Sequence, residues 1–264
     1  MKPLAYRNPI SVAAHRGNSK YFPENTIIAM QSAKDLNPDM IETDLHMTAD
    51  GHIIVMHDHL VDRTTNGTGL IREKTLAEMK SLDAGIWKGE EFAGEKVPTF
   101  EELLDVFRDR PNMLFNIELK DYPAMSGEFA FKSAEKSIAM MKEAGIWERS
   151  VINTWSGELN EYLVDRYGDD IRIHAYTPDR MGANQKKLAY NYAYCMCLFG
   201  VPEKLVVATS HFDFCKSYGV EPWVYYKVED PAVFDEAIAN GAMLFTANDP
   251  AWAMEYLRSK GLHD

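Results

Sequence analysis

Apolar and polar positions along the 264-residue chain follow two alternating patterns. Short apolar runs, typical of buried strands, are each followed by a run with apolar residues at helical spacing, typical of an amphipathic helix. The first pair is "ISVAAHRG" and "ENTIIAMQSAKDL", in which Ile27, Met30 and Leu36 have that spacing. The pattern therefore predicts a protein built from successive strand–helix units.

The same pairing continues towards the end of the chain. "MIETDLHM" and "HIIVMHD" are predicted strands joined by "TADG", whose Asp50-Gly51 pair favours a turn. "TFEELLDVFRDR" is a predicted helix in which Thr99 and Glu102 form a capping box, and "FAFKSAEKSIAMMKEAG" is a second helix that ends at Gly145. Later strands are predicted at "MLFNIELK", "VINTW", "IRIHAYT", "YAYCMCLF", "EPWVYY" and "MLFTAN".

About eight strand–helix units predict an α/β fold of the (β/α)₈ TIM-barrel type, forming a single domain over residues 1–264. Runs such as "MLFNI" are apolar on both faces, as expected for parallel strands covered by helices. No G-x-G-x-x-G motif follows the first strand, which disfavours a dinucleotide-binding fold. The stretch 59–98 is too long for an ordinary loop, so we expect a small insertion after the second strand that caps the C-terminal face.

The amino-acid composition limits which binding partners and which cellular compartment are expected for the protein. Hydrophobic content of 46% and charged content of 26% are ordinary for a soluble globular protein. The net charge of −12 argues against nucleic acid or an anionic membrane as a general partner, but not against an anionic substrate at a local site. Cys195, Cys197 and Cys215 cannot all pair, so we expect buried free thiols and a reducing compartment.

The N-terminal region lacks the pattern of an export signal. Arg7, Asn8 and Pro9 stand where a signal peptide needs its apolar region. No segment approaches the roughly 20 apolar residues of a membrane-spanning helix. We therefore expect a cytoplasmic protein without stable membrane association, although a chain trimmed of its export signal would give the same pattern.

Three acidic residues fall in strands that should otherwise be buried. Glu42 and Asp44 lie two positions apart in the second strand and so project from the same face, and Glu118 ends a neighbouring strand. Burying unpaired carboxylates together is unfavourable unless something offsets their charge. Three converging carboxylates form a hard-oxygen site that suits Mg²⁺ or Ca²⁺ better than zinc or copper. The sequence therefore predicts a divalent metal site.

Histidines and cations stand at the ends of the same strands. His15 and Arg16 end the first strand, His57 and Asp58 end the extended segment after the second, and Lys120 follows Glu118. Two histidines can act as a general acid and base near neutral pH. Arg16 and Lys120 can donate hydrogen bonds to a phosphate. Together with a metal that polarises a phosphoryl oxygen, this set predicts phosphodiester cleavage.

The remaining histidines and aromatic residues have less specific patterns. His46 continues the face of Glu42 and Asp44, and we expect it to have a hydrogen-bonded structural role. Five histidines have no acidic or basic residue at a spacing that suggests a site, and we interpret them as having no functional role: His52, His59, His174, His211 and His263. Four aromatic residues on late strands are expected mostly to pack within the barrel, with pocket lining as the alternative: Trp155, Tyr176, Trp223 and Tyr225.

Several of these motifs, in this order, resemble the glycerophosphodiester phosphodiesterases. The resemblance rests on "AAHRGNSKYFPENTIIAM", "IETDLHMTADGHIIVMHDHLVDRTTNGTG" and "NIELK", with "GAMLFTANDPAWAMEYL" resembling the end of that family's barrel. It is dense across residues 12–120 and thinner afterwards. The set of His-Arg-Gly, Pro-Glu-Asn-Thr, Glu-x-Asp, His-Asp and Glu-x-Lys is highly specific.

The resemblance implies a TIM barrel with a short insertion, and a reaction that releases glycerol 3-phosphate and an alcohol from a glycerophosphodiester. It also implies a proposed route in which the glycerol 2-hydroxyl attacks phosphorus and water then opens the cyclic phosphate. The roles that it implies are Ca²⁺ or Mg²⁺ ligands at Glu42, Asp44 and Glu118, acid and base at His15 and His57, and phosphate contacts at Arg16 and Lys120.

Two alternatives to this interpretation are a barrel that cleaves a different substrate and a barrel that binds phosphate esters without cleaving them. "EPWVYYKVEDP" stands where members usually show a Trp-Thr pair, and Trp155 where Phe is common, so the pocket wall departs from the family pattern. A phospholipase-like barrel acting on lysophospholipid is one alternative, but the insertion is charged, with Ile86 and Trp87 as its main exposed apolar candidates. A non-catalytic phosphate-ester-binding barrel is disfavoured because no histidine or acid of the set is missing. The leaving alcohol, the metal, the initial base and the oligomeric state stay undetermined.

Overall fold

A computed structural model describes residues 2–181, 185–199 and 207–264. Its centre is a nine-stranded sheet in the order β1-β9-β8-β7-β6-β5-β4-β2-β3, closed into a barrel by pairing of β1 with β2. The strands are β1 (Ser11–His15), β2 (Met40–Met47), β3 (Ile53–Val55), β4 (Leu114–Leu119), β5 (Ser150–Asn153), β6 (Ile173–Tyr176), β7 (Cys195–Phe199), β8 (Glu221–Tyr226) and β9 (Leu244–Ala247).

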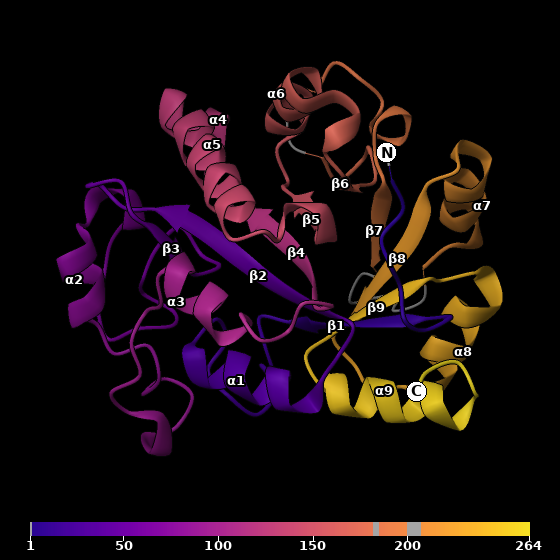
Figure 1. Ribbon diagram of the computed structural model, residues 1–264, viewed down its shortest axis with the longest axis horizontal. Helices are drawn as coiled ribbons and strands as arrows, with labels where there is room; N and C mark the ends of the chain where they lie inside the picture. The colour runs from indigo at the N-terminus through magenta and orange to yellow at the C-terminus, as the bar shows by residue number, and fades with distance from the viewer. Residues whose placement is uncertain (1, 182–184, 200–206) are drawn as a thin grey trace.

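The described helices lie around the outside of the strands (Figure 1). They are α1 (Ile27–Leu36), α2 (Leu76–Ser81), α3 (Phe100–Val106), α4 (Pro123–Ser126), α5 (Glu128–Glu143), α6 (Gly157–Tyr167), α7 (Thr209–Tyr218), α8 (Pro231–Asn240) and α9 (Pro250–Ser259). All strands of the barrel are parallel except β3, which pairs antiparallel with β2. The predicted TIM barrel is therefore confirmed.

Local signals in the sequence explain where several elements begin and end. The capping box predicted at Thr99 and Glu102 is present at the start of α3. Gly145 lies just beyond α5 in the left-handed region, at φ 69°, where glycine is favoured. One step of the repeat differs, because the described residues between β6 and β7 form a 3₁₀ turn at Ala189–Asn191 and no α-helix. The strand–helix alternation is thus incomplete at that connection.

The barrel interior changes from apolar to polar along the strands. A buried cluster fills the end where the strands begin, with one residue from most of the barrel strands: Ala13, Met40, Leu114, Val151, Cys195, Trp223 and Leu244. Two positions further along the same strands lie His15, Glu42, Asn116, Asn153, Cys197, Tyr225 and Thr246, which line a cavity. Because a two-residue step keeps a side chain on the same strand face, the apolar layer directly supports a polar layer nearer the C-terminal ends.

The segment between β3 and α3 has its own small apolar cluster, separate from the main core. Its buried members are Ile54, Met56, Val61, Ile71, Met79, Ala84 and Val97. Ile86 and Trp87 are 40% and 36% exposed, as the sequence predicts. The three cysteines are buried and unpaired, which confirms the expectation of free thiols. Within the described ranges, none of the helices combines the length and apolar character that a membrane crossing requires.

Candidate active site

The turn after β1 brings backbone and side-chain groups to the carboxyl ends of the strands. Arg16 lies at φ 57° and Gly17 at φ 81°, both in the left-handed region. A Cβ at Gly17 would approach the backbone of Ala29 to 2.7 Å, so glycine allows α1 to pack closely against this turn. The Arg16 N–H donates to the backbone oxygen and to Oε2 of Glu42, both at 3.0 Å. This contact links the ends of β1 and β2.

Glu42, Asp44 and Glu118 come together as the sequence predicts. β2 and β4 pair in a register that sets Asp44 opposite Glu118. One carboxylate oxygen from each of the three residues lies within 4.8 Å of the others, and all three side chains are buried. Burial, reinforced by the negative charge of Asp44, raises the pKa of Glu42 well above its ordinary value. The arrangement therefore holds concentrated negative charge away from water.

Two cations partly offset this charge. Arg16 Nε lies 3.3 Å from Asp44 Oδ2, while Lys120 Nζ lies 2.7 Å from Glu118 Oε1 and 3.6 Å from Asp44 Oδ1. Asn25 also donates its amide to Asp44 Oδ2 at 2.8 Å. Burial alone would raise the pKa of Asp44, but Arg16 and Lys120 hold it below its usual range.

The cluster has the donor chemistry of a hard divalent cation site. Among the described residues, Oδ1 of Asp44 accepts no hydrogen bond although it is buried. A buried carboxylate oxygen normally accepts a hydrogen bond, so this atom keeps a lone pair that could bind a cation. Three acids that share two cations leave an excess of negative charge. This set of carboxylate oxygens fits a divalent metal ion.

His15 is held in a defined orientation at the end of β1. Its Nδ1 lies 2.5 Å from Oδ1 of Asn248, and its Nε2 lies 3.9 Å from Oε2 of Glu42. Because an amide oxygen only accepts hydrogen bonds, Nδ1 carries the proton and Nε2 has the free lone pair. Burial, together with the charge of Arg16, lowers the pKa of His15 to about 3, so the ring is neutral at pH 7.

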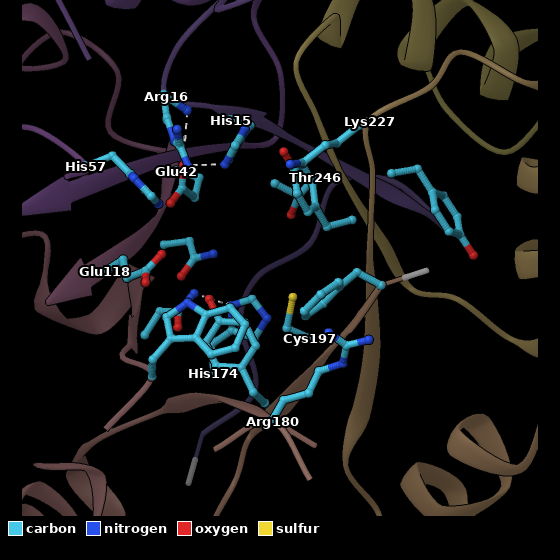
Figure 2. A pocket seen from close by; sticks show the side chains of 17 residues that line it. His15, Arg16, Glu42, His57, Glu118, His174, Arg180, Cys197, Lys227 and Thr246 are labelled. Carbon is cyan, nitrogen blue, oxygen red and sulfur yellow. Dashed lines mark hydrogen bonds and ion pairs between the residues drawn. The ribbon is translucent and has the colours of Figure 1, made fainter. Parts of the chain in front are cut away.

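His57 follows β3 and is oriented by a chain of charged residues. Its Nδ1 lies 2.6 Å from Oδ1 of Asp58, whose Oδ2 accepts from Arg63 Nε at 2.6 Å. Arg63 also contacts Glu24 at 2.7 Å, and Glu24 pairs with Arg16 at 2.8 Å. Burial lowers the pKa of His57, and the negative charge of Asp44 opposes this effect. Figure 2 shows His15 and His57 on opposite sides of Glu42.

Most of the predicted site residues line a cavity of about 500 Å³, whereas Asp44 and Lys120 are buried and do not belong to its lining. Arg16, Glu42, Glu118 and both histidines reach it directly. The described part of the chain adds polar groups that no sequence motif marks: Asn116, Asn153, His174, Arg180 and Lys227. This volume is in the usual range for a small-molecule site. A second cavity of about 480 Å³ shares His15, Arg16 and His57 and is bordered by Trp87 and Lys88 of the 59–98 segment.

The late aromatic residues pack within the barrel as expected, but three of the four also line the cavity. Trp155, Tyr176 and Tyr225 line the cavity, and the rings of Trp155 and Tyr176 stack with centroids 3.9 Å apart. Tyr176 is a buried member of the main core as well, whereas Trp223 has no exposed surface and does not reach the cavity. The physical reason is depth along the strand, since Tyr225 lies two positions beyond Trp223 on the same face and thus one layer higher.

Two of the histidines for which the sequence indicates no role have defined contacts in the structure. His174 lines the cavity, and burial lowers its pKa to about 3. His263 pairs with Asp39 at 2.9 Å, across a sequence separation that no local pattern reveals. His46 has the structural contact expected of it, with its Nδ1 2.8 Å from Asp121 Oδ1.

With this geometry established, comparison with known proteins assigns the chain to a family. Residues 15–246 match the model of the glycerophosphoryl diester phosphodiesterase family. The chain belongs to this family. A glycerophosphodiester phosphodiesterase from Caldanaerobacter subterraneus subsp. tengcongensis is 46% identical over 149 residues, which cover 55% of this chain and 58% of the relative. The aligned region thus spans little more than half the length of that curated relative.

Solved structures of the family share the barrel. The glycerophosphodiester phosphodiesterase from Agrobacterium tumefaciens is 26% identical, with a TM-score of 0.71 and coverage of 92% of this chain and 98% of the other. An Oleispira antarctica phosphodiesterase, solved in complex with the product sn-glycerol-3-phosphate, has a TM-score of 0.79 at 23% identity, covering 94% of this chain and 96% of the other. The resemblance noted in the sequence is therefore confirmed at the level of family and fold.

Proposed function

We propose that this member of the glycerophosphoryl diester phosphodiesterase family hydrolyses glycerophosphodiesters to glycerol 3-phosphate and an alcohol, in a reaction that depends on a divalent metal. The observation that supports this most strongly is a cluster of three buried carboxylates, two of which line the same cavity as two oriented histidines. A buried acidic cluster without a function would be unfavourable for stability. Placed beside groups that can move protons, it suits phosphoryl chemistry.

The metal is proposed to be Ca²⁺ or Mg²⁺, held by Glu42, Asp44 and Glu118. When bound, such an ion supplies positive charge that polarises a phosphoryl oxygen. Arg16 lies against Asp44 and lines the cavity, so its remaining N–H groups are proposed to bind the other phosphate oxygens. Lys120 is buried against Glu118, and its proposed contribution to phosphate binding is the positive charge that it places there. The phosphodiester is thereby fixed between β1, β2 and β4.

The two histidines are proposed to divide the proton transfers. His15 keeps its proton on Nδ1, towards Asn248, and is neutral, so its Nε2 can take the proton of the attacking oxygen. His57 is backed by the carboxylate of Asp58, which stabilises a protonated imidazole against the lowering of its pKa by burial. It can therefore give its proton to the leaving alcohol oxygen as the P–O bond breaks.

The 59–98 segment is proposed to act as a cap over the C-terminal face within one domain of residues 1–264. Trp87 and Lys88 border the outer cavity, and Lys88 Nζ donates to the backbone oxygens of Ser19 at 2.8 Å and Lys20 at 3.0 Å. These contacts tie the segment to the loop after β1. A cap in this position would limit access of water to the phosphodiester.

The proposed reaction is tested by product release from glycerophosphoethanolamine and glycerophosphocholine in the presence of Ca²⁺ or Mg²⁺. Lysophosphatidylcholine, assayed in parallel, tests the phospholipase-like alternative, which predicts faster turnover of the lipid.

The acid role of His57 is tested with a p-nitrophenyl ester of glycerol 3-phosphate, whose leaving group needs no proton. His57→Ala should lose far less activity on this ester than on glycerophosphoethanolamine, whereas His15→Ala should lose activity on both. Equal losses on both substrates for His57→Ala would overturn the assignment.

A further inference from the structure

Two cations on the wall of the main cavity have no part in the proposed chemistry. Arg180 lies in the connection after β6, and Lys227 immediately follows β8. Figure 2 shows Lys227 on the side of the cavity away from His57 and Glu118, and Arg180 at its lower edge. Both are therefore placed to meet a part of the substrate that extends away from the carboxylate cluster.

Neither cation is neutralised by an acid in the part of the chain that the structure describes. The ion pairs found there include Arg16 with Asp44 and Lys120 with Glu118, but none that involves Arg180 or Lys227. This is notable in a chain with a net charge of −12, where acids are in excess. Two cations that line one cavity without an acidic partner among the described residues favour a local positive potential against the charge of the whole molecule.

The guanidinium of Arg180 is also fixed in position by an aromatic ring. Its Cζ lies 3.9 Å from the centre of the Phe199 ring, a cation–π contact. Phe199 packs in turn edge-on against Trp155, with centroids 5.8 Å apart. A guanidinium held by stacking keeps its N–H groups free to bind an anion, and less conformational entropy is lost when it does so.

The same aromatic wall would otherwise suit a cationic head group. Quaternary ammonium groups bind against the faces of aromatic rings such as Trp155 and Tyr176. Here Arg180 already occupies a face of Phe199, and a second positive charge beside it would be repelled. The wall therefore discriminates against a choline-like group and favours a negatively charged one.

We propose that Arg180 and Lys227, from two edges of the cavity wall, favour binding of an anionic group, a phosphate monoester or a carboxylate, carried by the leaving alcohol. This inference rests on the proposed function and names its substrate class. The metal-binding side holds the phosphodiester that is cleaved, and the cavity of about 500 Å³ extends from there to the two cations. A diester with a second anionic group bridges the two sides.

The test uses two diesters that differ by one phosphate, glycerophosphoinositol and glycerophosphoinositol 4-phosphate, with glycerophosphocholine as a third substrate. The wild type should have the highest kcat/KM on the phosphorylated diester. Arg180→Gln should lower that kcat/KM about tenfold, as expected for loss of one charged hydrogen bond, and change glycerophosphoinositol little. Lys227→Gln should act in the same direction, with an effect that shrinks at high salt because Lys227 is exposed.

A matched control is Arg108→Gln, which removes an exposed cation paired with Asp105 outside the residues that line the cavity. It should leave the preference among the three diesters unchanged. The proposal is overturned if the wild type does not prefer the phosphorylated diester, or if Arg180→Gln lowers kcat/KM on all three substrates equally. The second result would assign Arg180 a purely structural role.

Failure of the proposed function would be recognised separately. If the metal-loaded wild type cleaves none of the diesters, calorimetric binding of myo-inositol 4-phosphate to EDTA-treated protein still tests the anion site, since no turnover is needed. Binding that Arg180→Gln weakens and Arg108→Gln does not would support the site. Binding that is undetectable, or that is equal in the wild type and Arg180→Gln, would overturn it.

Discussion

The two sides of the cavity are built on different principles. Around β1, β2 and β4, cations contact acids directly, as Arg16 does with Asp44 and Lys120 with Glu118. Around β6, β7 and β8 the lining is largely aromatic, and Arg180 has a ring as its contact and no carboxylate among the described residues. The side at β1, β2 and β4 concentrates charge at one point. The side at β6, β7 and β8 provides an aromatic contact surface and a separate positive potential. Reaction chemistry is therefore expected to depend on the first side and choice of substrate on the second.

The largest effect is expected from removing a histidine on the reactive side. His15→Ala or His57→Ala should lower kcat by about 10²–10⁴-fold, the range for loss of a general acid or base. The melting temperature should change little, because neither ring belongs to a described apolar core cluster. Steady-state kinetics with melting curves provide the measurement, and His211→Ala on α7 is the control. A rate near that of the wild type in either cavity variant would contradict the acid–base assignment.

An aromatic truncation on the other side should alter binding more than rate. Trp155→Ala removes the ring that stacks on Tyr176 at 3.9 Å. An aromatic contact contributes about 0.5–1.5 kcal/mol, so KM should rise by up to about tenfold while kcat is largely kept. Separate determination of kcat and KM distinguishes the two sides. A large fall in kcat at unchanged KM would remove the distinction between them.

The pH dependence of stability tests the charge cluster without substrate. The pKa of Glu42 is raised in the folded state, so its carboxyl stabilises the fold fully below the unfolded value of 4.5 and loses that contribution as pH rises above it. In EDTA, the difference in unfolding free energy between the wild type and Glu42→Gln should therefore shift in favour of the variant as pH rises above 4.5. Denaturant unfolding across pH 4.5 to 8 measures it. An identical pH profile in the variant would show that Glu42 is not under electrostatic strain.

The smallest effect on activity is expected at the opposite end of the barrel. Asp39 accepts hydrogen bonds from Asn8 at 2.8 Å and from the Val12 N–H at 2.9 Å, and it pairs with His263. Asp39→Asn should lower the unfolding free energy by about 1–3 kcal/mol, the usual effect on a buried charged hydrogen bond, with kcat unchanged. Chemical denaturation and kinetics on the same sample check both statements. A substantial fall in kcat would mean that the cavity depends on this remote network.

The two sides of the cavity also differ in how well their residues can be predicted from the sequence. Glu42 and Asp44 are two residues apart on one strand, and charged residues in an apolar run conflict with burial, so their function is visible locally. Arg180, Phe199 and Lys227 come from three separate connections or strands, and each alone has an ordinary pattern. Their meeting depends on the closure of the barrel, which no short motif encodes.

Depth within the barrel is the other feature that the sequence does not specify. Trp223 and Tyr225 have the same face and similar chemistry, but one belongs to the apolar layer and the other to the cavity. The level at which the interior becomes polar depends on the stagger of all strands around the barrel. The alternation of strands and helices, by contrast, predicts the fold because each unit carries its own periodicity.

The most direct test of the central claim, that the three buried acids hold the metal on which the reaction depends, is a calorimetric titration of EDTA-treated protein with Ca²⁺ or Mg²⁺, with the rate of glycerol 3-phosphate release measured at each point. One ion per chain should bind, and the rate should rise with the same midpoint as occupancy. Asp44→Asn should weaken both together. Full activity in EDTA, or metal binding that Asp44→Asn leaves unchanged, would contradict the account.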